Sequence, residues 1–318
     1  MESTAENRLL KLPPGAIENI RKIHNLNETG RLEEAIKILE DWIQKEDHIV
    51  KKDFGKGYLD RTLISCKGSV EKSKKLIDRL LTVTLYLYRK RNCVRCRIFF
   101  FVQCCNNIFS CSWVIPLPII TEDYCRVLIV KINNKNFTND SFMQYYQYHI
   151  ILIEYIKAHD YVNGFIVIID FSELNLFELM TKLNTVELQQ FLTIMIEGYS
   201  ARLKKIQMLT DSKAIELLVK TVKHIVSEKI GNRIHVQPTI EDLHKVVPKE
   251  ILPVEYGGNE RSIKKIQAEW VEAISSEEHV EYMKMMNKAC SDETKRHAVK
   301  FNEDYMGLPG SFRCLSVD

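Results

Sequence analysis

The stretch Gly164–Asp170 reads GFIVIID, and two comparable stretches lie before and after it, Arg126–Ile132 (RVLIVKI) and Leu203–Leu209 (LKKIQML). A shorter stretch, Ile234–Gln237, reads IHVQ. Short apolar runs rich in β-branched residues are typical of buried β-strands. The sequence therefore predicts four strands, and the first stretch quoted contributes the strand Phe165–Phe171 (FIVIIDF).

Helical patterns separate these strands at Asp140–His159, Thr185–Tyr199 and Ser212–Glu228. A chain that alternates strand and helix builds a parallel sheet with right-handed crossovers. We therefore expect an α/β domain with a short, mostly parallel sheet and flanking helices.

The predicted helices are strongly apolar. Their apolar positions are Phe142, Tyr145, Tyr146, His149, Ile153 and Ile156 in the first, Leu188, Phe191, Leu192, Met195 and Tyr199 in the second, and Ile215, Leu218, Val222, Ile225 and Val226 in the third. Such stripes face either a packed core or a lined cavity. The pattern alone leaves both possibilities open.

The chain outside this region divides into three further parts. Residues 1–90 predict a helical domain, with an amphipathic helix at Arg31–Lys45 and an N-cap at Ser69 for another helix. Residues 91–111 form an atypical cysteine-rich connection, and residues 260–318 a helical, highly charged tail.

Composition excludes several classes of protein. The 318 residues carry a net charge of only +3, and the total charge therefore gives no indication of nucleic-acid binding. The amino terminus lacks the apolar run of a signal peptide, and no stretch reaches the roughly 18 apolar residues that cross a bilayer. We expect a cytoplasmic monomer whose membrane contact is peripheral.

Five of the nine cysteines fall within residues 91–111. Cys93 and Cys96 have the spacing of half a zinc site, but Cys104 and Cys105 are adjacent and no histidine is near. A reducing cytosol disfavours disulfides. We expect neither a bound metal nor a disulfide framework in this segment.

Motifs for catalysis are missing from the sequence. It contains no G-x-G-x-x-G after a strand, no G-x-x-x-x-G-K-[ST] phosphate loop and no G-x-S-x-G elbow. Asp170 ends a strand, where it could act as a catalytic acid or cap the following turn. The sequence therefore predicts neither an enzyme nor a cofactor.

Two further motifs carry a family resemblance. Ser227–Val236 reads SEKIGNRIHV and Ile251–Gly258 reads ILPVEYGG. Together with GFIVIID, these motifs resemble the CRAL-TRIO lipid-transfer family, in the branch of alpha-tocopherol transfer protein and cellular retinaldehyde-binding protein. The resemblance implies a CRAL-TRIO domain over residues 112–259, preceded by an all-α domain. Arg91–Cys111 departs from the family pattern.

The resemblance also implies a pocket for one hydrophobic lipid, closed by a gate helix at Ser212–Val226. The residues implied for the pocket wall are Phe165, Ile169, Phe191, Ile194, Met195, Ile206, Leu218 and Val222. The identity of the lipid stays open among retinoids, tocopherols, sterol-like molecules and phospholipids.

Basic residues stand at four positions that relatives use to recognise phosphoinositide headgroups: Arg202, Lys204, Lys229 and Arg233. The resemblance therefore implies a carrier that docks on membranes containing phosphatidylinositol bisphosphate. A phosphoinositide-sensing signalling or scaffold module that moves no lipid is the alternative.

Overall fold

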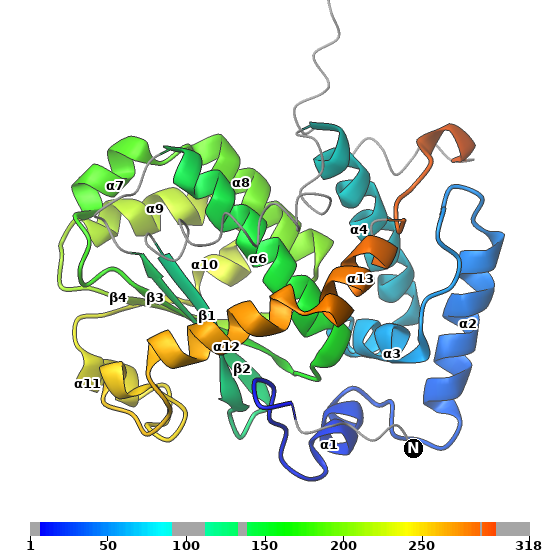
Figure 1. Ribbon diagram of the computed structural model, residues 1–318, viewed down its shortest axis with the longest axis horizontal. Coiled ribbons are helices and arrows are strands. Elements are labelled where there is room, and N and C mark those ends of the chain that lie inside the picture. Colours follow the sequence, from blue (N-terminus) through cyan, green and yellow to red (C-terminus); the bar gives the residue numbers. More distant parts are fainter. Residues whose placement is uncertain (1–6, 91–111, 133–138, 287, 297–318) are drawn as a thin grey trace, which may run out of the picture.

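The computed structural model describes residues 7–90, 112–132, 139–286 and 288–296 (Figure 1). One sheet has the strand order β1-β2-β3-β4-β5. The strands are β1 Ser112–Ile120, β2 Cys125–Ile132, β3 Gly164–Asp170, β4 Leu203–Leu209 and β5 Ile234–Gln237. β1 pairs with β2 antiparallel, and all other pairs are parallel. The predicted α/β class with a mostly parallel sheet is confirmed.

Strand β1 was not among the strands predicted from the apolar runs. It contains Pro116 and Pro118, and its register with β2 shifts between Pro116 and Ile120. Proline has no N–H to donate to a ladder and is therefore confined to edge strands and bulges. β1 is accordingly the edge of the sheet, and its prolines hide the strand pattern in the sequence.

Crossover helices connect the parallel strands. They are α6 Asn139–His159, α7 Leu176–Lys182, α8 Thr185–Thr193, the π-helical turn η2 Ile194–Gly198, α9 Ile215–Ile225 and α10 Glu228–Gly231. Because successive strands are neighbours and parallel crossovers are right-handed, these helices share one face of the sheet. In Figure 1, α7, α8 and α9 are grouped on one side of the strands.

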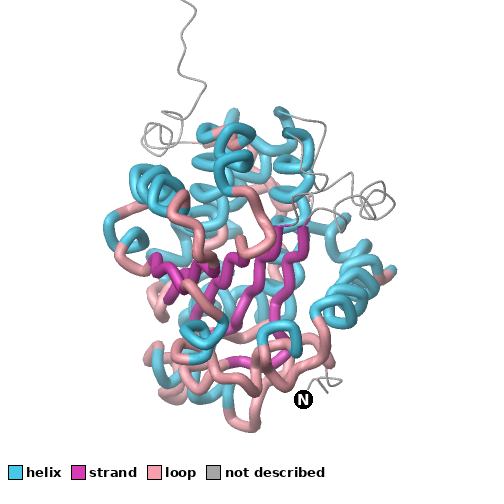
Figure 2. Tube along the Cα trace, turned by 90° about the vertical axis from the view of Figure 1, so that its left-hand side faces the viewer, coloured by secondary structure: helices cyan, strands magenta, loops and turns pink. Residues whose placement is uncertain are grey.

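The carboxyl-terminal part wraps around the sheet. It comprises α11 Ile240–His244, η3 Val254–Tyr256, α12 Ile263–Ser275, α13 Glu277–Met286 and η4 Glu293–Lys295. The indole N–H of Trp270 in α12 donates to the carbonyl of Pro116 in β1 at 2.8 Å. Figure 2 shows the strands as a central layer with helices around it.

The amino-terminal helices have a core of their own. They are α1 Ala16–Ile23, α2 Arg31–Lys45, α3 Lys56–Ser65 and α4 Val70–Lys90. Leu39, Ile43 and Leu59 in this core are fully buried. The hydroxyl of Ser69 accepts a hydrogen bond from the amide of Lys72 at 3.3 Å, which makes Ser69 the predicted N-cap of α4.

A buried ion pair joins three elements of the sheet domain. Arg126 in β2 donates to both carboxylate oxygens of Asp160, which follows α6, at 2.8 Å each, and neither side chain has any exposed surface. The same guanidinium donates to the carbonyls of Leu117 and Pro118 in β1, at 3.0 and 2.6 Å. Arg126 thus satisfies carbonyl groups of β1 where its register with β2 is broken.

Within the described ranges, no helix combines the length and apolar character needed to cross a membrane. No group of three or more His, Cys, Asp or Glu side chains in that part of the chain could hold a metal ion. The predictions for Cys93, Cys96 and Arg91–Cys111 lie outside the described residues.

Replacing Arg126 with methionine should lower the free energy of unfolding by about 3–5 kcal/mol, because Asp160 would be left as an unpaired charge in the interior. Urea denaturation followed by circular dichroism measures this loss. Lys284→Met is the control, since Lys284 pairs with Glu281 at 2.6 Å but both side chains are over 60% exposed. We expect that variant to lose less than about 1 kcal/mol. Equal losses of unfolding free energy in the two variants would show that the buried pair stabilises the fold no more than an exposed pair.

Candidate functional site

The two faces of the sheet are buried to different extents. The strand register places Leu128, Val167 and Ile169 on the face that carries Phe165, and all of these side chains are only half-buried. Their neighbours on the opposite face, Ile129 and Ile168, have no exposed surface. A central strand with packed layers on both sides would bury both sets equally. The helices therefore leave Leu128, Phe165, Val167 and Ile169 partly accessible, whereas Arg126, Val130 and Met208 on the same face are buried.

The helix above this face is also loosely packed. No residue of α8 is buried, and the stretch Phe191–Ile196 is half-buried at every position. A helix packed flat against a sheet buries one stripe and exposes the other. Between α8 and α9 lies an open groove of about 430 Å³, with Val186 and Leu217 among its lining residues. The groove is lined by residues of α8 and α9 and by no residue of the sheet. We call the partly accessible sheet face together with these two helices the candidate lipid pocket.

Six of the eight predicted wall residues belong to one apolar cluster with the sheet: Phe165, Ile169, Phe191, Ile206, Leu218 and Val222. Ile206 and Leu218 are buried, and the other four are half-buried. Ile194 and Met195 instead pack against the core of the amino-terminal helices. The structure brings the six together and separates these two, whose role in the wall stays a prediction.

The sequence pattern did not single out Leu128 and Val167 as wall residues. Val167 could have been found from the two-residue period of β3, since it lies between Phe165 and Ile169. Leu128 is recognised only through its pairing with Val167 across two strands.

Aromatic side chains of α6 pack against α8. The ring of Phe191 in α8 stacks on Tyr146 at 4.4 Å and meets His149 edge-on at 5.3 Å. Tyr145 lies 4.1 Å from the His149 ring. Burial lowers the pKa of His149 to about 4, only partly offset by its contact with the Tyr145 carbonyl. The imidazole is therefore neutral at physiological pH.

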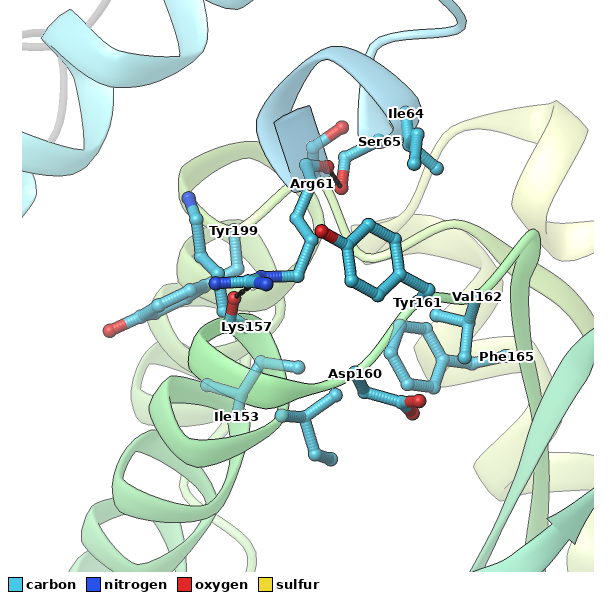
Figure 3. A pocket seen from close by; sticks show the side chains of 12 residues that line it. Arg61, Ile64, Ser65, Ile153, Lys157, Asp160, Tyr161, Val162, Phe165 and Tyr199 are labelled. Atoms are coloured by element: carbon cyan, nitrogen blue, oxygen red, sulfur yellow. Dashed lines mark hydrogen bonds between the residues drawn. The ribbon is translucent and has the colours of Figure 1, made fainter. Parts of the chain in front are cut away.

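A separate small cavity lies where α3 meets the end of α6 (Figure 3). Arg61, Ile153, Tyr161 and Phe165 are among its lining residues, and its volume is about 40 Å³. Nε of Arg61 donates to the carbonyl of Lys157 at 2.7 Å across this junction. The space holds a few water molecules at most, so it belongs to the contact between the helical and sheet domains and is too small for a lipid.

The four predicted phosphoinositide residues converge at the amino-terminal ends of β4 and β5. Nη1 of Arg202 lies 2.9 Å from Nε2 of His24, and the guanidinium of Arg233 donates to the carbonyl of Leu203. Burial is the main cause that lowers the pKa of Arg202, and the positive charge of Arg233 lowers it further. Sequence positions about 30 apart thus form one basic surface, because β4 and β5 are neighbours.

Lys67 extends this surface from the amino-terminal domain. Its pKa is lowered chiefly by the charge of Arg202 and then by that of Lys229. We call Lys67, Arg202, Lys204, Lys229 and Arg233 the basic patch. Among the described residues, no carboxylate forms an ion pair with any of them. Lys67 was not among the predicted residues, because it lies in the turn between α3 and α4, far from the others in the chain.

Asp170 has a structural environment. One carboxylate oxygen accepts hydrogen bonds from the amide and hydroxyl of Ser172, at 2.9 and 2.6 Å. The other accepts from the Tyr256 hydroxyl at 2.7 Å and lies 3.4 Å from Nζ of Lys131. Of the two roles considered for Asp170, the geometry supports the cap. Tyr256, within ILPVEYGG, thereby ties that motif to the end of β3.

Comparison with known proteins agrees with this architecture. A family model described as the CRAL/TRIO domain matches residues 112–258. Proteins named alpha-tocopherol transfer protein-like from Homo sapiens and Pongo abelii are each 26% identical to this chain over 98 residues. These matches cover 30% of this chain and 28% of each relative, less than a third of their length.

The crystal structure of Sfh5 matches with a TM-score of 0.52 and 12% identity, and the match covers 81% of this chain and 97% of that one. At this identity the likeness shows a shared fold. The predicted resemblance is confirmed by the family match, the relatives and the fold. Residues 112–258 of this chain are a CRAL/TRIO domain, preceded by the helices α1 to α4.

Proposed function

We propose that this protein binds one hydrophobic lipid between its sheet and helices α8 and α9, and carries it between membranes that display phosphoinositides. The observation that carries the proposal is the half-buried apolar face at Leu128, Val167 and Ile169, beneath helices that do not close over it. Each methylene of a lipid that enters such a site gains about 0.8 kcal/mol over exposure to water. A site of this kind can therefore compete with a bilayer for the lipid.

Helix α9, within the predicted gate Ser212–Val226, is suited to open. Its inner side buries Ile215 and Leu218, while Val222 is half-buried and Leu217 is 54% exposed. Phe177 on α7 and Val186 on α8 are also exposed, at 69% and 57%. Exposed apolar side chains on adjacent helices favour contact with a lipid surface. In this proposal α9 opens at the membrane, where acyl chains replace its contacts.

The basic patch would orient the protein for this step. Gly231 lies between Lys229 and Arg233, and a Cβ there would come within 3.3 Å of the Lys223 side chain on α9. The end of the gate thus packs closely on the segment that carries two patch residues. A headgroup phosphate would be bound by Lys229 and Arg233 through charge-assisted hydrogen bonds. It would therefore lie next to the carboxyl-terminal end of the gate helix.

A phosphoinositide sensor that moves no lipid is the second candidate. The specific observation that favours it is that the basic patch includes Lys67, Arg202 and Lys204, none of which depends on an occupied pocket. Transfer between vesicles separates the two functions. A carrier accelerates the movement of lipid from donor to acceptor vesicles, whereas a sensor only binds them.

Filling the pocket should block lipid uptake without loss of stability. We expect Ile169→Trp to keep the free energy of unfolding within about 1 kcal/mol and to abolish retinol binding, because the new ring occupies the incompletely covered space. Ile168→Trp, the same change on the opposite face of β3, should cost about 1–3 kcal/mol through overpacking. Retinol fluorescence and urea denaturation measure the two effects. If Ile169→Trp destabilised the protein as much as Ile168→Trp, the first face would be ordinary core.

Removing two lysines of the basic patch should weaken membrane docking. Near an anionic leaflet each lysine contributes about 1 kcal/mol, so Lys204→Ala with Lys229→Ala should weaken binding to vesicles containing phosphatidylinositol bisphosphate by about 30-fold. The two lysines are better positions for this test than Arg202 and Arg233. The guanidiniums of those arginines form hydrogen bonds within the protein, so replacing them would also remove structural contacts. Vesicle sedimentation at low and high salt measures the loss.

The control for this pair is Lys264→Ala with Lys265→Ala, which removes the same charge from two exposed positions on α12. That helix packs on β1, at the opposite edge of the sheet from β5. We expect the control to bind vesicles like the unaltered protein. Equal binding by both double variants would contradict the proposed docking surface.

A further inference from the structure

Helix α13 contributes side chains to both hydrophobic cores. Met283 has no exposed surface and belongs to the core of the sheet domain, whereas Met286 is buried in the core of the amino-terminal helices. Tyr282 packs against both cores. In Figure 1, α13 is drawn in orange between the sheet domain and the helices α2 and α4. The helix therefore holds the two domains together at their junction.

One buried polar side chain of α13 makes no hydrogen bond. His279 is only 1% exposed, and neither Nδ1 nor Nε2 has a hydrogen-bond partner among the residues that the structure describes. Its ring lies 5.0 Å from that of Tyr155 in α6 and stacks on Tyr282 at 5.8 Å. A buried charge needs a partner, and an imidazolium would have none here. The closed junction therefore requires the neutral form of His279.

The charges that act on His279 come from α6. Burial is the main cause that lowers the pKa of His279 to about 4; His159 lowers it further, and the carboxylate of Glu154 raises it. Glu154 has no exposed surface and accepts a hydrogen bond from the Tyr199 hydroxyl at 2.7 Å. The attraction of Glu154 for a protonated His279 is thus weaker than the cost of removing that charge from water.

His159 lies at the end of α6, and its ring is 4.5 Å from that of Tyr155. Burial is the main cause that lowers the pKa of His159, and the charge of Arg61 lowers it further, whereas Glu278 and Asp160 raise it. His159 and His279 thus contact the same tyrosine ring. When both are protonated, their like charges repel each other across the contact between α6 and α13.

We propose that α13 is an acid-sensitive latch, which joins the helical and sheet domains at neutral pH and detaches from their junction when His279 is protonated. The inference goes beyond the proposed function and does not depend on it. A protonated His279 regains its hydration only when α13 moves aside and water reaches the ring. Protonation of one side chain would thereby move a helix that belongs to both cores.

The direction of the pH dependence follows from the two states of the latch. With α13 detached, His279 takes its ordinary pKa of 6.5, whereas with α13 in place the pKa is about 4. The detached state therefore binds more protons between these values, and the attached state is lost as the pH falls from about 6.5 toward 4. At pH 5 the ratio of detached to attached α13 should be about 30-fold higher than at pH 7.5.

Hydrogen exchange of the backbone amides of α13, measured by mass spectrometry at pH 7.5 and pH 5 and corrected for the intrinsic exchange rates, tests this proposal. We expect the protection of α13 to fall about 30-fold at pH 5, while the amides of β3 keep theirs. In His279→Phe the fall should shrink to about threefold or less, because the ring is kept and the titrating group is removed. His279→Gln, which is also neutral at both pH values, should behave in the same way and covers the case that the phenylalanine variant does not fold.

His235→Phe is the matched control, since His235 is an exposed histidine on β5. It should keep the full loss of protection in α13 at pH 5. The proposal is overturned if α13 of the unaltered protein is equally protected at both pH values, or if the His279 variants keep the full loss. It is also overturned if His235→Phe abolishes the loss, or if β3 loses protection as much as α13, because acid would then unfold the whole protein.

Discussion

A guanidinium without access to water must find all its partners inside the protein, and Arg126 of β2 finds them in β1 and at the end of α6. Asp160 neutralises it at the end of α6, while the carbonyls of Leu117 and Pro118 use its remaining donors. Since the cost of an unpaired buried charge is several kcal/mol, these elements have to meet at one place. The edge strand, the second strand and the start of β3 are thereby held in register. Phe165, at the start of β3, depends on that register for its place on the pocket face.

Polar contacts also fix the amino-terminal helices on the rest of the chain, besides the bond from Arg61 to the Lys157 carbonyl. Arg202 meets His24 on one side, and Arg296 from the carboxyl-terminal segment donates to both carboxylate oxygens of Asp78 in α4 on the other, at 3.0 and 2.8 Å. The first contact belongs to the basic patch, which explains why Lys67 of the helical domain lies beside Lys229. The docking surface proposed here is thus shared between two parts of the chain. Its geometry depends on how they are joined.

Much of the fold could be predicted because its determinants are local. The alternation of apolar residues that defines a strand lies within the strand itself, and β4 and β5 have the predicted bounds. The motif ILPVEYGG was recognisable for the same reason, and the structure shows its Tyr256 bonded to Asp170. Strand β1 was not predicted because Pro116 and Pro118 interrupt its apolar pattern. They are tolerated because β1 has a neighbouring strand on one side only, which the sequence does not reveal.

The sequence by itself determined the α/β class, the family and the presence of four basic residues in the CRAL/TRIO domain. Each of these depends only on the residue types within short stretches of the chain. Only the tertiary structure decided which apolar side chains of the sheet stay half-buried, that Ile194 and Met195 pack toward the helical domain, and that Lys67 joins the basic patch. Burial and hydrogen-bond satisfaction depend on the groups that approach from elsewhere in the chain. A single stretch of sequence records a side chain's chemistry, whereas its partners are set by the packing of the whole fold.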